Sequence, residues 1–209
     1  MKHYLIILQA VIVILCFPVF YFFGTSASPL HSFVFSFLAY WFFIAFGSTA
    51  VVIFDQKAAV QLKEYFQIPR KKILILINFI PSAAVLFIVF LPALQNIHVR
   101  LFSTVLVIAL FNGTFEEIFW RGLVLSKYAS SAGFLAVSTC LFGIYHFAFL
   151  LLPLKYQGGA PNLVGGAVFM GLIWLIVSRY TKNILYSIFA HILVNCFTFS
   201  GLFVDNQLL

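Results

Sequence analysis

The chain has 209 residues, of which 64% are hydrophobic and only 8% are charged, and its mean hydropathy is +1.11. A soluble domain carries roughly 25% charged residues, so this composition excludes an ordinary soluble protein and indicates a protein that crosses a membrane several times. In such a protein the formal net charge of +7 reflects basic residues in cytoplasmic loops. The charge therefore gives no reason to expect a nucleic-acid partner.

Seven apolar stretches approach or exceed the roughly 20 residues that a membrane-spanning helix needs. They cover residues 4–23, 33–54, 73–94, 101 to about 126, 131–152, 163–177 and 184–204. The first stretch resembles a signal peptide, because Thr25-Ser26-Ala27 could be cleaved. Its apolar core is longer than the ~7–15 residues of such a signal, so we interpret it as a retained helix. In the third stretch, Pro81 predicts a kink.

The long polar connection between the second and third stretches, residues 55–72, carries a cluster of basic residues. They are Lys57, Lys63, Arg70, Lys71 and Lys72. Apolar residues recur here at helical spacing, so an interfacial helix on anionic lipid and a solvated basic loop are both open. A cytoplasmic N-terminus places this cluster inside and leaves only Arg100 and Lys155 outside, which is the orientation expected from the positive-inside rule. We expect a multi-pass protein of the plasma membrane.

The chain shows no soluble domain, repeat or low-complexity tract, so we expect one integral membrane domain over residues 1–209. Residues 1–100 would supply three generic spans and the basic loop, and residues 101–204 the helices of a functional site. The three cysteines lie in apolar runs without the spacing of metal ligands. We interpret them as small packing residues.

The stretch F-N-G-T-F-E-E-I-F-W-R, residues 111–121, places two acids and an arginine inside an apolar span. A charge there is expensive, so each carboxylate must be paired, protonated, bound to a metal or exposed to a water-filled cavity. Glu117 and Arg121 are four residues apart and can pair on one helix face. Glu116 is rotated by roughly 100° from Glu117, so the two acids need not share a partner and Glu116 is left free for chemistry.

Two histidines, His146 and His191, lie within other predicted spans, and Asn195 shares a helix face with His191. A carboxylate and two imidazoles can be the ligands of a hydrolytic zinc ion, or a general base with its orienting partners. The candidate metal ligands are Glu116, His146 and His191, and Zn²⁺ is the candidate cofactor. The sequence has neither H-E-x-x-H nor G-x-S-x-G, so it lacks the patterns of zincins and of serine hydrolases.

Three motifs on successive helices resemble those of the CPBP intramembrane proteases, which include type II CAAX prenyl endopeptidases and bacteriocin-processing or immunity (Abi) proteins. The motifs are Glu116-Glu117-x-x-x-Arg121, Phe142-x-x-x-His146 and His191-x-x-x-Asn195. The resemblance covers about residues 101–204. It implies an all-α polytopic bundle with a conical active-site cavity open to the cytoplasm. It also implies an endopeptidase acting on a membrane-associated or lipidated peptide or protein.

By the same resemblance, Glu116 would activate the attacking water, and His146 and His191 would bind that water or a metal and stabilise the oxyanion. Asn195 would assist at the oxyanion, while Glu117 and Arg121 would hold the site or the substrate. Metal-dependent and metal-independent mechanisms both stay open, as do the substrate and the oligomeric state. The expected partners are membrane lipid and a peptide or protein substrate.

Two other functions are compatible with the sequence. A non-catalytic immunity or binding protein could keep the same scaffold. A small transporter could use buried Glu and His as a proton relay, but no inverted repeat is visible.

Overall fold

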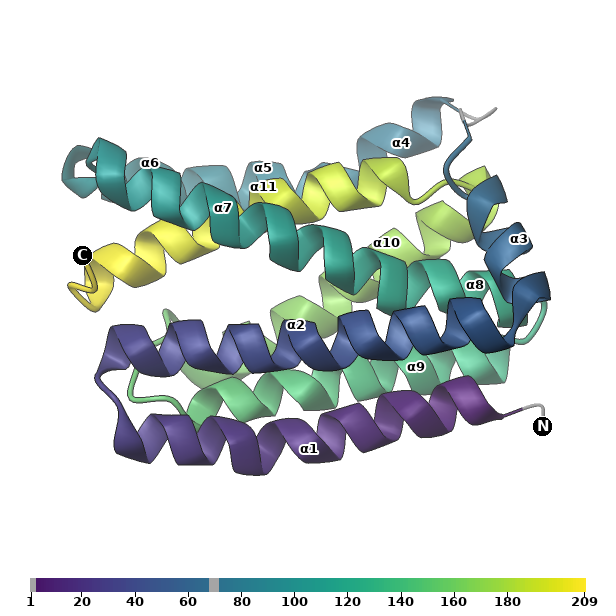
Figure 1. Ribbon diagram of the computed structural model, residues 1–209. Coiled ribbons are helices and arrows are strands. Elements are labelled where there is room, and N and C mark those ends of the chain that lie inside the picture. The colour runs from purple at the N-terminus through teal and green to yellow at the C-terminus, as the bar shows by residue number, and fades with distance from the viewer. Residues whose placement is uncertain (1–2, 68–71) are drawn as a thin grey trace.

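The computed structural model describes residues 3–67 and 72–209, which form a bundle of helices with no strand in that part of the chain (Figure 1). The first half contains α1 (Tyr4–Ser26), α2 (Pro29–Phe54), α3 (Gln56–Glu64), α4 (Lys72–Asn78), α5 (Ile80–Val85), η1 (Leu86–Phe90), α6 (Leu91–Ala93) and η2 (Leu94–Asn96). The second half contains α7 (Val99–Glu116), η3 (Glu117–Gly122), α8 (Leu123–Tyr128), α9 (Ala132–His146), η4 (Phe147–Leu151), η5 (Pro161–Gly165), α10 (Gly166–Thr181) and α11 (Leu185–Asp205).

Six helical stretches among the described residues are long and apolar enough to cross a membrane. They are Tyr4–Ser26, Pro29–Phe54, Val99–Tyr128, Ala132–Leu151, Pro161–Thr181 and Leu185–Asp205. They coincide with six of the seven predicted spans, because uninterrupted apolar sequence of this length satisfies its own backbone hydrogen bonds as a helix. The prediction of a multi-pass membrane protein is confirmed.

The third predicted span is wrong as a single helix. The chain turns at Phe79, between α4 and α5, and the continuous apolar helix that follows, Ile80–Asn96, is shorter than the others. Pro81 lies in the first turn of α5, where its missing N–H is tolerated, but it cannot continue α4. Pro92 follows a π-helical stretch, η1, in which the N–H of Leu91 reaches back five residues to the carbonyl of Leu86.

One end of the bundle, which we call the basic end, contains the polar connection predicted over residues 55–72 and most of the described basic residues. Its basic residues are Lys57, Lys63, Lys72 at the start of α4, Lys127, Arg179 and Lys182. Residues 56–64 of the connection form a helix, α3, which packs on α8, so this part is helical and not an irregular loop. Asp55 caps α3 and pairs with Lys127 at 2.6 Å. Lys2, Arg70 and Lys71, which the topology prediction also used, lie outside the described residues.

The opposite end, the loop end, contains residues 152–160 and the C-terminal end of α11, which lies far from α3 in Figure 1. There Asn206 bonds both backbone groups of Lys155, so the loop is tied to α11. The prediction for the cysteines is correct for Cys16 and Cys196, which are buried, and wrong for Cys140, which is exposed on α9.

Candidate functional site

The two acids lie where the long helix Val99–Tyr128 changes its hydrogen-bonding pattern. After α7, the segment η3 is π-helical, and the N–H of Leu123 bonds the carbonyl of Ile118, five residues back. Such one-turn π segments are rare and occur frequently at functional sites. Within it, Arg121 Nη1 lies 3.1 Å from Glu117 Oε1, and both side chains are buried. The predicted Glu117–Arg121 pair is confirmed.

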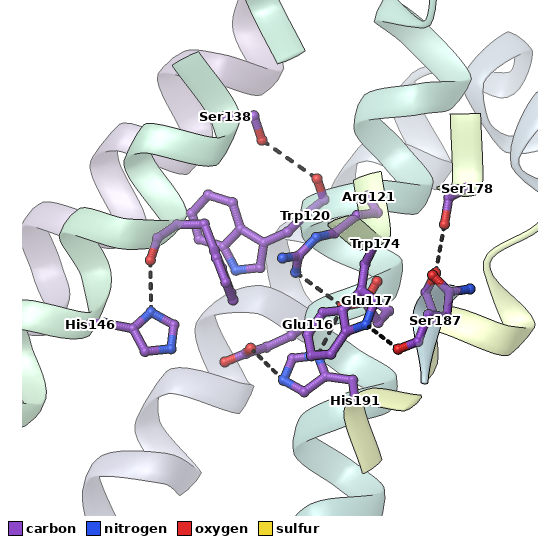
Figure 2. A network of polar contacts seen from close by, with 12 residues as sticks. Glu116, Glu117, Trp120, Arg121, Ser138, His146, Trp174, Ser178, Ser187 and His191 are labelled. Carbon is purple, nitrogen blue, oxygen red and sulfur yellow. Dashed lines mark hydrogen bonds and ion pairs between the residues drawn. The ribbon is translucent and has the colours of Figure 1, made fainter. Parts of the chain in front are cut away.

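His191 of α11 contacts both acids, although the sequence analysis did not expect the two acids to share a partner. Its Nδ1 lies 2.8 Å from Glu117 Oε1, and its Nε2 lies 3.4 Å from Glu116 Oε2 (Figure 2). The imidazole also stacks on Trp174, with ring centroids 4.4 Å apart. The acids therefore share a partner, and His191 fixes Glu116 relative to the Glu117–Arg121 pair.

Two glycines allow these elements to approach. A Cβ on Gly113 would lie 2.9 Å from the backbone nitrogen of Ile192, so α7 and α11 can be this close only without a side chain there. A Cβ on Gly171 of α10 would lie 2.5 Å from Arg121 Nη2. The guanidinium carbon of Arg121 lies 4.0 Å from the centre of the Phe142 ring. Arg121 thus packs on the Phe142 ring and close to the backbone of Gly171.

His146 ends α9, and its Nδ1 lies 2.8 Å from the carbonyl oxygen of Phe142. A carbonyl only accepts hydrogen bonds, so Nδ1 carries the proton and, in the neutral ring, Nε2 keeps its lone pair. The ring of Phe142 packs on this imidazole, with centroids 4.7 Å apart. In the view of Figure 2, the Glu116 carboxylate lies between His146 and His191.

A cavity of about 380 Å³ brings four of the six predicted site residues together. Glu116, His146, His191 and Asn195 line it, from α7, α9 and α11. Glu117 and Arg121 do not line it and lie buried behind His191. The chain thus supplies four polar side chains to the cavity wall and a buried ion pair that supports one of them.

The cavity wall also contains Asn112, which the sequence analysis passed over although it lies one helical turn before Glu116. The indole N–H of Trp41 donates to Asn112 Oδ1 at 2.9 Å. An indole N–H can only donate, so this bond fixes which end of the amide is oxygen. The amide NH₂ of Asn112 is then free to donate elsewhere. The signal was the F-N-G-T-F-E spacing, which puts an amide and an acid on one helix face.

The predicted zinc ligands do not fit a metal centre as arranged. A catalytic zinc ion takes three protein ligands at about 2.0–2.3 Å. Among the residues that the structure describes, no three His, Cys, Asp or Glu side chains converge in this way. In particular, His146 does not join Glu116 and His191 as a third ligand.

The cavity extends towards the loop end and not towards the basic end. Its lining includes Tyr156, Gln157 and Asn162, which lie at the loop end. On the other side of the site, the side chains of Trp120 and Leu123 are buried in the core. With the predicted cytoplasmic N-terminus, the loop end is non-cytoplasmic. The expected cytoplasmic opening and the predicted orientation are therefore incompatible.

Comparison with known protein families gives one match. Residues 98–197 match the family model for "Type II CAAX prenyl endopeptidase Rce1-like" proteins. That range contains all six predicted site residues. No curated protein and no solved structure gives a significant match to the chain.

Proposed function

Because residues 98–197 form a domain of the Rce1-like type II CAAX prenyl endopeptidase family, one of the CPBP intramembrane proteases, we propose that this protein is an endopeptidase that uses Glu116 to activate water inside the membrane. The main support is the cavity lined jointly by Glu116, His146 and His191, which come from three different helices. A buried acid beside two imidazoles is a general base with groups to position its water.

In the proposed reaction, a water held in the cavity transfers a proton to Glu116 as its oxygen attacks the peptide carbonyl carbon. The lone pair of His146 Nε2 accepts a hydrogen bond from the same water and orients it. Glu116 then passes the proton to the leaving amine as the C–N bond breaks, so the carboxylate is restored. The burial of Glu116, which is 1% exposed, limits competing solvent.

Two amides supply donors for the oxyanion that forms on the carbonyl oxygen. Asn195 Nδ2 is buried without a hydrogen-bond partner among the described residues, although it belongs to a residue of the cavity wall. Leaving such a donor unpaired costs roughly 1–3 kcal/mol, and a bond to the oxyanion would remove this cost in the transition state. Asn112, oriented by Trp41, is the second donor.

Glu117 and Arg121 act through His191. Arg121 compensates the charge of Glu117, and Glu117 accepts a hydrogen bond from His191 Nδ1. This bond orients the ring so that Nε2 faces Glu116. An aligned base needs such a fixed neighbour, because rates fall steeply when the reacting group is misplaced by about 1 Å. We assign positioning roles to this pair.

The test is cleavage of quenched fluorescent hydrophobic peptides, CAAX-type tails included, by the protein in proteoliposomes. Glu116→Gln should lower the rate by at least about 100-fold, because it removes the base. The matched control is Glu64→Gln, an exposed acid on α3, which should retain the wild-type rate. Dialysis against a chelator should also leave the rate unchanged.

Equal rates for wild type and Glu116→Gln would reject the proposal. Cleavage that the chelator abolishes and zinc restores would reject the metal-free form of the reaction.

A further inference from the structure

The helix α2 contacts the catalytic helix with two adjacent aromatic residues, Tyr40 and Trp41. It packs on both α7 and η3. Trp41 donates a hydrogen bond to Asn112, and the Tyr40 hydroxyl lies beside the Glu116 carboxylate, within reach of a hydrogen bond. Asn112 and Glu116 are four residues apart, so neighbouring residues of α2 contact successive turns of α7. Tyr40 itself is fully buried and does not line the cavity.

Trp120 determines which way the Tyr40 hydroxyl can donate. The indole N–H of Trp120 donates to the Tyr40 oxygen at 2.8 Å, and both side chains are at most 2% exposed. An indole nitrogen only donates, so Tyr40 is the acceptor in this bond and its own proton points elsewhere. A buried hydroxyl proton without an acceptor is costly. The Glu116 carboxylate is an acceptor within its reach.

Tyr145 of α9 is the competing partner of this hydroxyl. Its ring stacks on that of Tyr40, with centroids 4.0 Å apart, and its own hydroxyl makes no close hydrogen bond to the described residues. A hydrogen bond to a carboxylate is roughly twice as strong as one between neutral groups, so the Tyr40 proton goes to Glu116. The stack and the bond from Trp120 together hold the Tyr40 ring in place.

A second fixed partner matters for a base on a long side chain. Glu116 has three side-chain torsions, and its other partner is His191 Nε2 at 3.4 Å from Oε2. A bond from Tyr40 on α2 adds a contact from a different helix and restricts rotation of the carboxylate. Rates fall steeply when a reacting group is misplaced by about 1 Å, so this restriction bears directly on proton transfer from the water.

We infer that Tyr40 is a positioning residue for Glu116, with a hydroxyl that donates to the carboxylate and holds the base in its orientation at the cavity wall. The bond from Trp120 directs this hydroxyl. The inference rests on the proposed endopeptidase function and adds to it a residue that touches neither substrate nor water. Tyr40 keeps its proton throughout the reaction.

The first experiment tests the contact without using activity. Unfolding by SDS in mixed micelles is measured for Tyr40→Phe, for Glu116→Leu, which removes the acceptor, and for the double variant. The product of the two single changes in the unfolding equilibrium constant should exceed the change in the double variant at least about 5-fold, because the bond is lost only once. The matched cycle with Tyr145→Phe, which removes the hydroxyl of the stacked ring, should show coupling below about 2-fold.

Equal coupling in the two cycles, or none for Tyr40, would overturn the inference. If Glu116→Leu does not accumulate, Glu116→Gln takes its place. The expected coupling is then at least about 3-fold, because the amide oxygen still accepts a weaker bond.

The second experiment measures cleavage kinetics in proteoliposomes. Tyr40→Phe should lower kcat at least about 10-fold and change KM less than about 2-fold, because only the orientation of the base is altered. Tyr145→Phe should keep both within about 2-fold of the wild type. In the Glu116→Gln background, Tyr40→Phe should cause no further loss, whereas general damage to the fold would lower the residual rate again.

A normal kcat for Tyr40→Phe would overturn the inference and leave the endopeptidase proposal standing. Absence of cleavage by the wild type would reject the endopeptidase and, with it, the catalytic purpose of the contact, whose existence the unfolding cycle decides.

Discussion

Replacing Arg121 by methionine should destabilise the protein far more than any loss of a surface ion pair. Arg121 and Glu117 have side chains that are 3% and 0% exposed, so the substitution leaves a buried carboxylate with His191 as its remaining partner. Removing one member of a buried pair costs roughly 3–5 kcal/mol. Loss of the guanidinium from the face of Phe142 adds about 0.5–2 kcal/mol. We expect a loss of at least about 3 kcal/mol in the free energy of unfolding.

The chain offers a matched control in the ion pair between Lys127 and Asp55, whose side chains are 20% and 21% exposed. Lys127→Met should cost less, about 1 kcal/mol, because this pair is partly solvated and partly screened. The double variant Glu117→Gln/Arg121→Met should recover much of the loss, since it removes both charges. Equilibrium unfolding by SDS in mixed micelles measures all three. If Arg121→Met and Lys127→Met cost the same, the buried pair does not have the role assigned to it.

Three further predictions concern the contact of α7 with α11, the amide of Asn112, and Asp55, which caps α3. Gly113→Ala should lower the free energy of unfolding by about 1–3 kcal/mol and the cleavage rate at least 10-fold, because its Cβ would push against the backbone of α11. The control Gly133→Ala, which has open space around it, should change neither quantity. Equal effects of the two substitutions would contradict this. Asn112→Ala should lower the cleavage rate about 10- to 100-fold. Trp41→Phe should lower the rate about 5-fold in the wild type and not at all in the Asn112→Ala background. Additive losses would show that Trp41 does not act through the amide. Hydrogen bonding to Lys127 and to the α3 backbone lowers the pKa of Asp55 to about 2, below its unfolded value of roughly 4. The ionised Asp55 therefore stabilises the folded protein fully above about pH 4, and this stabilisation is lost as the pH falls towards 2. The difference in thermal stability between wild type and Asp55→Asn should therefore shrink below pH 4, and a difference independent of pH would refute the assignment.

The sequence predicted the spans well where the helix is determined by its own apolar residues and not by its neighbours. Apolar length determines where helices such as α1 and α11 begin and end, because a lipid-embedded backbone must bond within its own segment. The third span failed because Pro81 and Pro92 interrupt that local pattern, and Pro81 marked the break only to within two residues. The break at Phe79 depends on how α4 and α5 pack on α10 and α11.

The site was predictable as far as residue spacing allows. The pairing of Glu117 with Arg121 is a property of one helix and followed from four-residue spacing. The sharing of His191 by both acids is a property of two helices and depends on the contact that Gly113 permits. Helical spacing does not reveal which glycine makes such a contact.

The direction of the cavity was not predictable from hydropathy. Both halves of each span are apolar, so nothing in the sequence distinguishes the half that packs around Trp120 from the half that leaves space beside Glu116. The family resemblance implied a cytoplasmic opening, whereas the lining residues place the mouth at the loop end. The packing that places the mouth there is not visible in the sequence.

The central claim is that Glu116 and His146, on separate helices, act on the same water. The most direct measurement is the residual cleavage rate of Glu116→Gln, of His146→Ala and of the double variant under identical conditions. Groups that act as a unit give non-additive losses, so the double variant should be no slower than the slower single variant, within about 3-fold. A double variant whose loss equals the product of the two single losses would show that the residues act independently.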